Sequence, residues 1–162
     1  MKVKVSQIKA GARSVLDQVT TIKEIRIASL ECHGEPVPHS GMLTVNTDVG
    51  VGVSQNEDKS SIEVRVEYAV VSTTPEEPVV EAWRVILTVV GVWDQDAEKQ
   101  FSHPDLWSFA VLVGVITLHP YAREIVQSAV SRMGYPAYLM EIFRSPAELL
   151  GDDAEVEAPD EG

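Results

Sequence analysis

The segment Leu43-Thr-Val-Asn-Thr-Asp-Val-Gly-Val-Gly-Val53 decides the fold class, because its side chains alternate in character. Five of its six odd positions hold leucine or valine, and the even positions hold only polar residues and glycine. A period of two is typical of a strand with one buried face. Gly50 and Gly52 lie inside the pattern, where we expect them to relieve crowding or bend the sheet. The sequence therefore predicts a sheet packed on a core.

Three more β-like segments surround this strand. Residues 22–32 precede it, and their alternation slips by one position, as at a β-bulge. Residues 62–70 alternate apolar with charged side chains, whereas residues 79–93 are rich in apolar groups on both faces. We expect another element to cover the second face of that last strand. Four consecutive strands, most of them joined by short turns, predict an antiparallel meander.

Helical periodicity frames the strands on both sides. Ser6 can cap a helix that precedes the first strand. A capping box begins at Ser102, Pro120 either kinks the helix that follows or starts a new one, and Gly134 ends it. These signals predict a single α+β domain over residues 1–150, with a four-stranded antiparallel meander sheet, a kinked C-terminal helical hairpin and an additional N-terminal helix.

Composition limits the classes of partner. The chain has 162 residues, of which 44% are hydrophobic, and 13 basic against 25 acidic residues give a net charge of −12. Such a balance disfavours binding to nucleic acid. Acidic residues are dense after residue 150, so residues 151–162 are predicted to form a disordered, solubilising tail.

Several features favour a cytoplasmic protein. Cys32 is the only cysteine, and the first residues lack the continuous apolar stretch of an export signal. The longest charge-free apolar run, residues 106–118, is shorter than the ~20 residues that cross a bilayer, so we expect no membrane insertion.

Motifs of catalysis are missing from the sequence. There is no nucleophile elbow, P-loop or dinucleotide fingerprint, and the four histidines do not have the spacing of a metal site. We therefore expect no enzyme activity, no cofactor and no bound metal. An enzyme whose acids and histidines converge only in the fold stays an alternative, which a loss of turnover in His33→Ala would support.

Excess apolar surface is the most prominent feature. Trp83 and Trp93 lie on the strand with two apolar faces, and residues 135–143 are aromatic and aliphatic without the period of a regular element. Such surface fits a subunit interface, a groove for an extended apolar ligand, or both. A small-molecule or lipid carrier with an enclosed apolar cavity is a further alternative.

The segment Leu118-His-Pro-Tyr-Ala-Arg-Glu-Ile-Val-Gln-Ser-Ala-Val-Ser-Arg-Met-Gly-Tyr-Pro136 resembles the signature region of SecB-type export chaperones. The strands are similar too, through Gly91-Val-Trp93 and Leu43-Thr-Val45. The likeness covers residues 22–150, so the N-terminal helix and the acidic tail lie outside it.

This resemblance implies an ATP-independent holdase, a homotetramer built as a dimer of dimers that binds unfolded polypeptide in hydrophobic grooves. It implies that the long helix packs between dimers, which would explain the apolar run at residues 106–118. By position it assigns to the groove Leu43, Val45, Tyr138, Met140 and Ile142. On physical grounds we add Trp83, Phe143, Leu149 and Leu150.

The client is either an exported preprotein or an antitoxin. The export branch of the family docks a motor ATPase on an acidic face of the sheet, and Glu24 falls where an acid is expected. Arg84 and Ile86 depart from that pattern. The helix ahead of the first strand instead resembles SecB-like chaperones that accompany toxin-antitoxin pairs, and we favour this branch.

Overall fold

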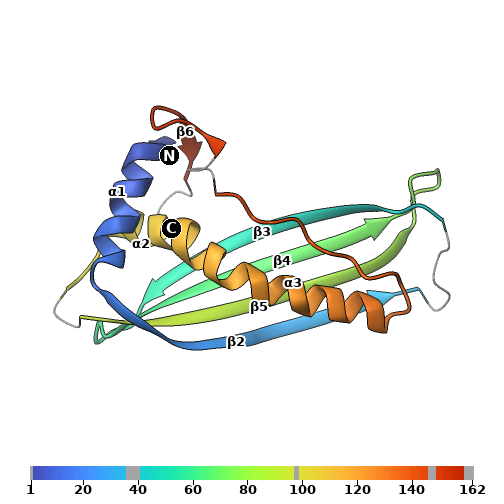
Figure 1. Ribbon diagram of the computed structural model, residues 1–162, viewed down its shortest axis with the longest axis horizontal. Coiled ribbons are helices and arrows are strands. Elements are labelled where there is room, and N and C mark those ends of the chain that lie inside the picture. Colours follow the sequence, from blue (N-terminus) through green and yellow to red (C-terminus); the bar gives the residue numbers. More distant parts are fainter. Residues whose placement is uncertain (1, 36–40, 97–98, 146–148, 159–162) are drawn as a thin grey trace.

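The computed structural model describes residues 2–35, 41–96, 99–145 and 149–158. Two short strands and an N-terminal helix lie at one end of a long four-stranded sheet, and a long helix runs along the sheet (Figure 1). The elements are β1 Lys2–Lys4, α1 Val5–Leu16, β2 Val19–Gly34, β3 Thr44–Gln55, β4 Ser61–Thr73, β5 Glu81–Gln95, α2 His103–Phe109, the π-helical segment η1 Ala110–Gly114, α3 Val115–Arg132 and β6 Glu155–Glu157.

The predicted α+β class with a four-stranded antiparallel sheet is confirmed, but the strand order is not a full meander. The order is β2-β5-β4-β3, so β3 to β5 form a meander and β2 pairs with β5 rather than with β3. The physical reason is that β5, apolar on both faces, takes a central position, while the more polar β2 and β3 form the edges. The predicted bulge is confirmed by register shifts in β2, one of them between Ile27 and Ser29.

The C-terminal helices do not form a hairpin. Segments α2, η1 and α3 make one continuous helix of 30 residues, His103–Arg132, and Pro120 lies inside it. The predicted start is confirmed, because the backbone N–H of Asp105 donates to Ser102 Oγ at 3.3 Å. The predicted end is confirmed as well, since Gly134 has a φ of 87°. Beyond it Pro136 lacks a backbone donor, and the chain returns without regular structure.

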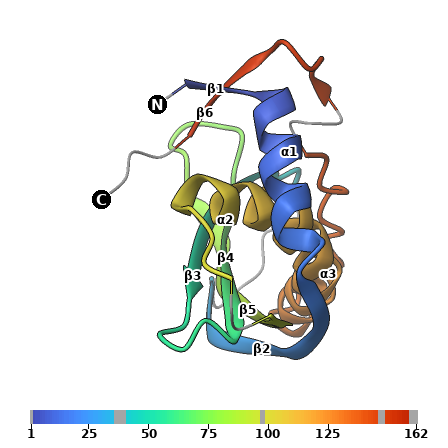
Figure 2. The same ribbon diagram turned by 90° about the vertical axis from the view of Figure 1, so that its left-hand side faces the viewer.

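The core lies between the long helix and one face of the sheet (Figures 1 and 2). Alternate residues of β4 and β5 are fully buried against α3 residues such as Leu118 and Val126. Gly114 brings the helix close to the sheet, because a Cβ there would lie 2.7 Å from Val64 Cγ1. The helix is long and apolar enough to pass for a membrane span, yet part of its most apolar stretch is buried inside the molecule.

No helix covers the second face of β5 in the described chain, although the sequence predicts that another element packs there. Val90 is fully buried, although the helices pack on the other face. Arg26 of β2 and Arg65 of β4 flank Val90 in register, and their guanidinium groups lie 3.4 and 3.5 Å from the carboxylate of Glu63. Charged side chains with long aliphatic stems therefore shield this face in place of a covering element.

The N-terminal helix is confirmed, and it packs on α2 rather than on the sheet. Its buried residues Val5, Ile8, Ala12 and Val15 face the molecule. The start at Val5, one residue before Ser6, is stabilised by the backbone N–H of Lys4, which donates to Gln7 Oε1 at 3.1 Å.

The prediction of a disordered tail over residues 151–162 is wrong for its first part. Strand β6 pairs antiparallel with β1. Lys9 lies 2.6 Å from Asp152, and Lys2 lies 3.6 Å from Glu155. The acids thus find basic partners at the other end of the chain, which the local sequence does not reveal. Residues 159–162 lie outside the described residues.

Candidate functional site

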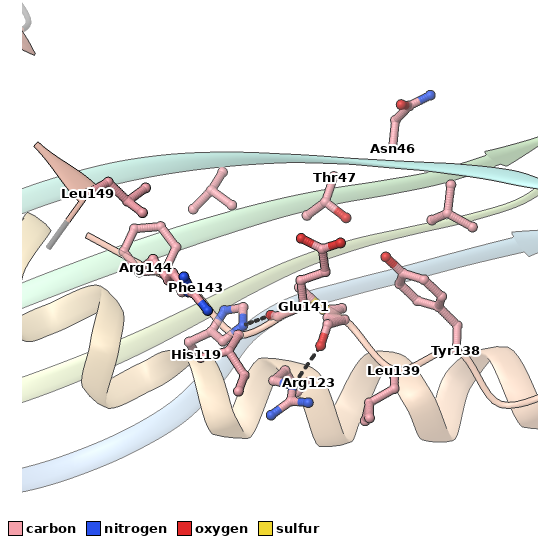
Figure 3. Close-up of a pocket in the computed structure, with 14 residues that line it drawn as sticks. Asn46, Thr47, His119, Arg123, Tyr138, Leu139, Glu141, Phe143, Arg144 and Leu149 are labelled. Carbon is pink, nitrogen blue, oxygen red and sulfur yellow. Dashed lines mark hydrogen bonds between the residues drawn. The ribbon is translucent and has the colours of Figure 1, made fainter. Parts of the chain in front are cut away.

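A long groove runs beside the edge strand β3. We call residues 135–145, the irregular segment that forms its other wall, the strap. The wide section of the groove has a volume of about 920 Å³ and the narrow section about 520 Å³. Both sections share Val45 of β3 and Tyr138 of the strap, so they are continuous. Figure 3 shows the wide section, with Thr47 on the strand side and Tyr138 on the strap side.

Side-chain hydrogen bonds to backbone carbonyls hold the strap in place. On α3, Arg123 Nε donates to the Met140 carbonyl at 2.8 Å, and His119 Nε2 lies 2.7 Å from the Glu141 carbonyl (Figure 3). The Tyr135 hydroxyl donates to the Ala82 carbonyl at 3.0 Å. In the described chain, no backbone N–H of residues 136–144 donates to a backbone carbonyl. The strap is therefore attached at a few points rather than by a ladder.

Aromatic packing shapes the floor of the narrow section. Trp83 is only 2% exposed, and its ring centroid lies 5.7 Å from that of Tyr138 and 6.5 Å from that of Tyr135. Leu43 reaches the same section from the start of β3. Burial of two aromatic rings on an indole fixes the start of the strap against the sheet.

Eight of the nine predicted client-binding residues line the groove. Leu43 and Trp83 line the narrow section, Val45 and Tyr138 line both sections, and Met140, Ile142, Phe143 and Leu149 line the wide one. Leu150 is exposed but does not line either section. The strap residue Met140 is 1% exposed and packs into the core, whereas Ile142 at 73% and Leu149 at 61% face solvent. The predicted set thus divides into a buried support and an exposed lining.

Glu24 lies far from this groove in the sheet. It is on β2, the edge strand opposite β3, and its carboxylate forms an ion pair with Arg26, whose Nε lies 3.0 Å away. Arg84 contacts Glu31 at 3.9 Å and Glu81 at 3.7 Å. Acids in this part of the sheet therefore have basic neighbours.

His119 lies under the strap in a nearly closed environment, 7% exposed. A carbonyl can only accept, so Nε2 carries the proton, and Nδ1 accepts from the Tyr68 hydroxyl at 3.3 Å. The rings of Tyr68 and Phe143 lie 5.7 and 5.9 Å from the imidazole. Burial, and to a lesser extent the charge of Arg123, lower the pKa of His119, against the opposing effect of the Glu141 carbonyl.

The described residues contain no group of three or more histidine, cysteine, aspartate or glutamate side chains placed to hold a metal ion. Burial, together with the neighbouring charge of Glu31, raises the pKa of the Cys32 thiol, which favours the unreactive thiol form. Burial also raises the pKa of the Tyr68 hydroxyl. The site offers shape and apolar contact.

Two residues that hold the strap, His119 and Arg123, are not among the residues predicted from the sequence. His119 and Arg123 are part of the signature segment, but the sequence gives no sign that their side chains reach the carbonyls of residues 140 and 141. A histidine and an arginine separated by four positions share a helix face, which was the available signal. Their partners belong to an irregular segment whose path no periodicity predicts.

Comparison with known proteins identifies the fold. No protein-family model matches the sequence, and no curated protein matches it. The structure is similar to Mycobacterium tuberculosis Rv1957, a SecB-like chaperone solved in complex with a ChAD peptide from the Rv1956 HigA1 antitoxin. The TM-score is 0.75 at 19% sequence identity, over 85% of this chain and 99% of that chain. The chain therefore has a SecB-like fold, as its signature segment predicted.

Proposed function

We propose that the protein is an ATP-independent chaperone that holds unfolded polypeptide in the groove between β3 and the strap. The observation that carries this proposal is an open groove with large apolar side chains exposed along its lining. Ile142, Leu149 and Leu139 are each at least 60% exposed, a costly arrangement for residues that nothing covers. Each Å² of apolar client surface buried there contributes about 25 cal/mol, so holding needs no nucleotide.

An extended client fits this groove better than a folded one. Strand β3 is an edge strand, and in the described chain no strand pairs with its outer side. A client in extended conformation can therefore add backbone hydrogen bonds to β3 while alternate side chains enter the groove. Recognition by backbone pairing and apolar area depends little on the identity of the client's side chains, so the specificity is broad.

We infer an antitoxin as the client rather than an exported preprotein. The similar chaperone Rv1957 binds a peptide from an antitoxin. In addition, this chain has a helix ahead of its first long strand, the feature by which its sequence resembles SecB-like chaperones of toxin-antitoxin pairs. Docking of an export motor ATPase has weaker support, because Glu24 is already in contact with Arg26 and the neighbouring strand offers Arg84. A pull-down with the motor ATPase separates the two roles.

The chaperone acts, in this proposal, as a homotetramer built as a dimer of dimers. Edge strand β2 carries Ile22, Ile27 and Leu30 and helix α3 carries Ile116, all at least 40% exposed and outside the groove. A second copy that pairs along β2 would cover the three β2 residues, and a further copy packed on α3 would cover Ile116. Light scattering tests the assembly: Ile27→Lys should lower the solution mass, and a wild-type monomer would contradict it.

An enclosed carrier cavity is less compatible with this geometry. The groove lining includes Ile142 and Leu149, which face solvent, so an apolar small molecule would stay in contact with water. A single bound lipid recovered from the purified protein would favour the carrier instead.

Suppression of aggregation tests the function. The purified protein, without ATP, should prevent a chemically unfolded client from aggregating, and Tyr138→Asp with Ile142→Asp should abolish this effect, because a carboxylate resists burial against the client. Val79→Asp is the matched control, since Val79 is exposed but lines neither section. Equal activity of the groove variant and the control would show that clients do not bind in the groove.

A further inference from the structure

We propose that His119 is a positioning residue that holds the strap only while its imidazole is neutral, so that acidification releases this wall of the groove. Loss of the client on acidification rests on the proposed function. The release of the strap does not depend on it. It starts from the two hydrogen bonds of the ring, 2.7 Å to the Glu141 carbonyl and 3.3 Å to the Tyr68 hydroxyl.

The neutral ring matches its surroundings in one tautomer only. Nε2–H donates to the strap, and Nδ1 accepts from Tyr68, whose side chain is fully buried. Protonation would turn Nδ1 into a donor, so the Tyr68 hydroxyl would have to accept and its own hydrogen would lose its acceptor. An unpaired buried donor is unfavourable, and the penalty ends when the strap leaves and water enters.

The positive charge of Arg123 acts in the same direction as burial, and the hydrogen bond to the Glu141 carbonyl acts against both. The ionisable groups that face this region are Tyr68 from β4, Arg123 from α3, and Glu141 and Arg144 from the strap. Strand β3 contributes Val45, Asn46, Thr47 and Val49 to the wide section, and these do not titrate. Arg123 already places one positive charge beside the ring, while Tyr68 and Phe143 surround it with apolar carbon.

The strap is held mainly by side-chain packing, such as that of Tyr138 on Trp83, and its backbone makes few hydrogen bonds. Between the aromatic start of the strap at Tyr135 and its buried Ser145, the side chains of His119 and Arg123 make the only hydrogen bonds to the strap backbone among the described residues. Segments held by so few hydrogen bonds open more readily than the sheet beneath them. The direction of the pH effect follows from the lowered pKa of His119. Docking of the strap is complete above the pKa of histidine in an unfolded chain, near 6.5, and weakens as the pH falls below that value.

Peroxide oxidation of Met140 in the full-length protein tests the release, because this strap side chain is 1% exposed while the strap is docked. The oxidation rate of Met140 should rise between about pH 7.5 and about pH 5.5 in the wild type relative to His119→Gln at the same pH. Glutamine can donate to the same carbonyl but does not titrate in this range. The expected excess is about two- to tenfold, the equilibrium equivalent of one hydrogen bond. Identical pH profiles for the two proteins would overturn the proposal.

A measurement on the wild type alone guards against a variant that fails to fold. The midpoint of strap opening should coincide with the titration of the His119 ring followed by NMR, and separate midpoints would contradict a causal link. Binding of a labelled apolar peptide without histidine or acidic residues should weaken over the same range. A peptide that binds at no pH would refute the proposed function, while the comparison of Met140 oxidation would still decide the role of His119.

Discussion

The contribution of Ile142 to client binding can be worked out from its exposure. The side chain is 73% exposed in the free protein, and it lines the wide section of the groove. Ile142→Ala removes three carbon atoms, each worth about 0.8 kcal/mol on full burial. Scaled by the exposed fraction and by incomplete cover in a complex, the loss is about 1–2 kcal/mol, or roughly 5- to 30-fold in Kd.

Fluorescence anisotropy with a labelled apolar peptide measures this loss. Ile142→Val should fall between the wild type and Ile142→Ala, since it removes only one carbon. Val79→Ala, exposed but outside the groove, should bind as the wild type does. A Kd for Ile142→Ala within about twofold of the wild-type value, which corresponds to less than ~0.5 kcal/mol, would show that Ile142 does not contribute to client binding. Unchanged thermal unfolding of the variants would show that the fold is intact.

Two further predictions concern stability. Gly114→Ala should lower the free energy of unfolding by about 1–3 kcal/mol, because its Cβ would press on Val64, whereas Gly50→Ala, whose Cβ would lie 3.8 Å from the Cβ of Glu67, should raise it by about 0.5–1 kcal/mol. Calorimetry should then show Tm shifts of opposite sign, at about 2–4 °C per kcal/mol, and equal shifts would contradict the packing argument. Ser102→Ala should cost about 1 kcal/mol through loss of the cap on α2, and denaturant melts that match the wild type would show that the cap is dispensable.

Local patterns predicted the elements well. The alternation in residues 43–53, the cap at Ser102 and the turn at Gly134 each depend on neighbours in sequence, and each is present in the structure. Strand order depends instead on which strand can accept burial on both faces. That competition placed β5 in the centre and β2 at its side, against the simple meander.

The site was predictable in composition but not in geometry. Apolar excess and resemblance together indicated the groove residues, and the structure brings eight of the nine together. The anchors His119 and Arg123 depend on where an irregular segment crosses the helix, and the pairing of β6 with β1 joins the two ends of the chain. Contacts of such long sequence separation leave no periodic signal.

One of the two expected roles of Gly50 and Gly52 is wrong. A Cβ would fit at both positions, so these glycines are not needed to relieve crowding between β3 and β4.

Hydrogen exchange with and without a saturating unfolded client shows where the client binds. If it binds between β3 and the strap, exchange should slow in both of these segments and stay unchanged in the opposite edge strand β2. Protection confined to β2, with β3 and the strap unchanged, would contradict binding in the groove.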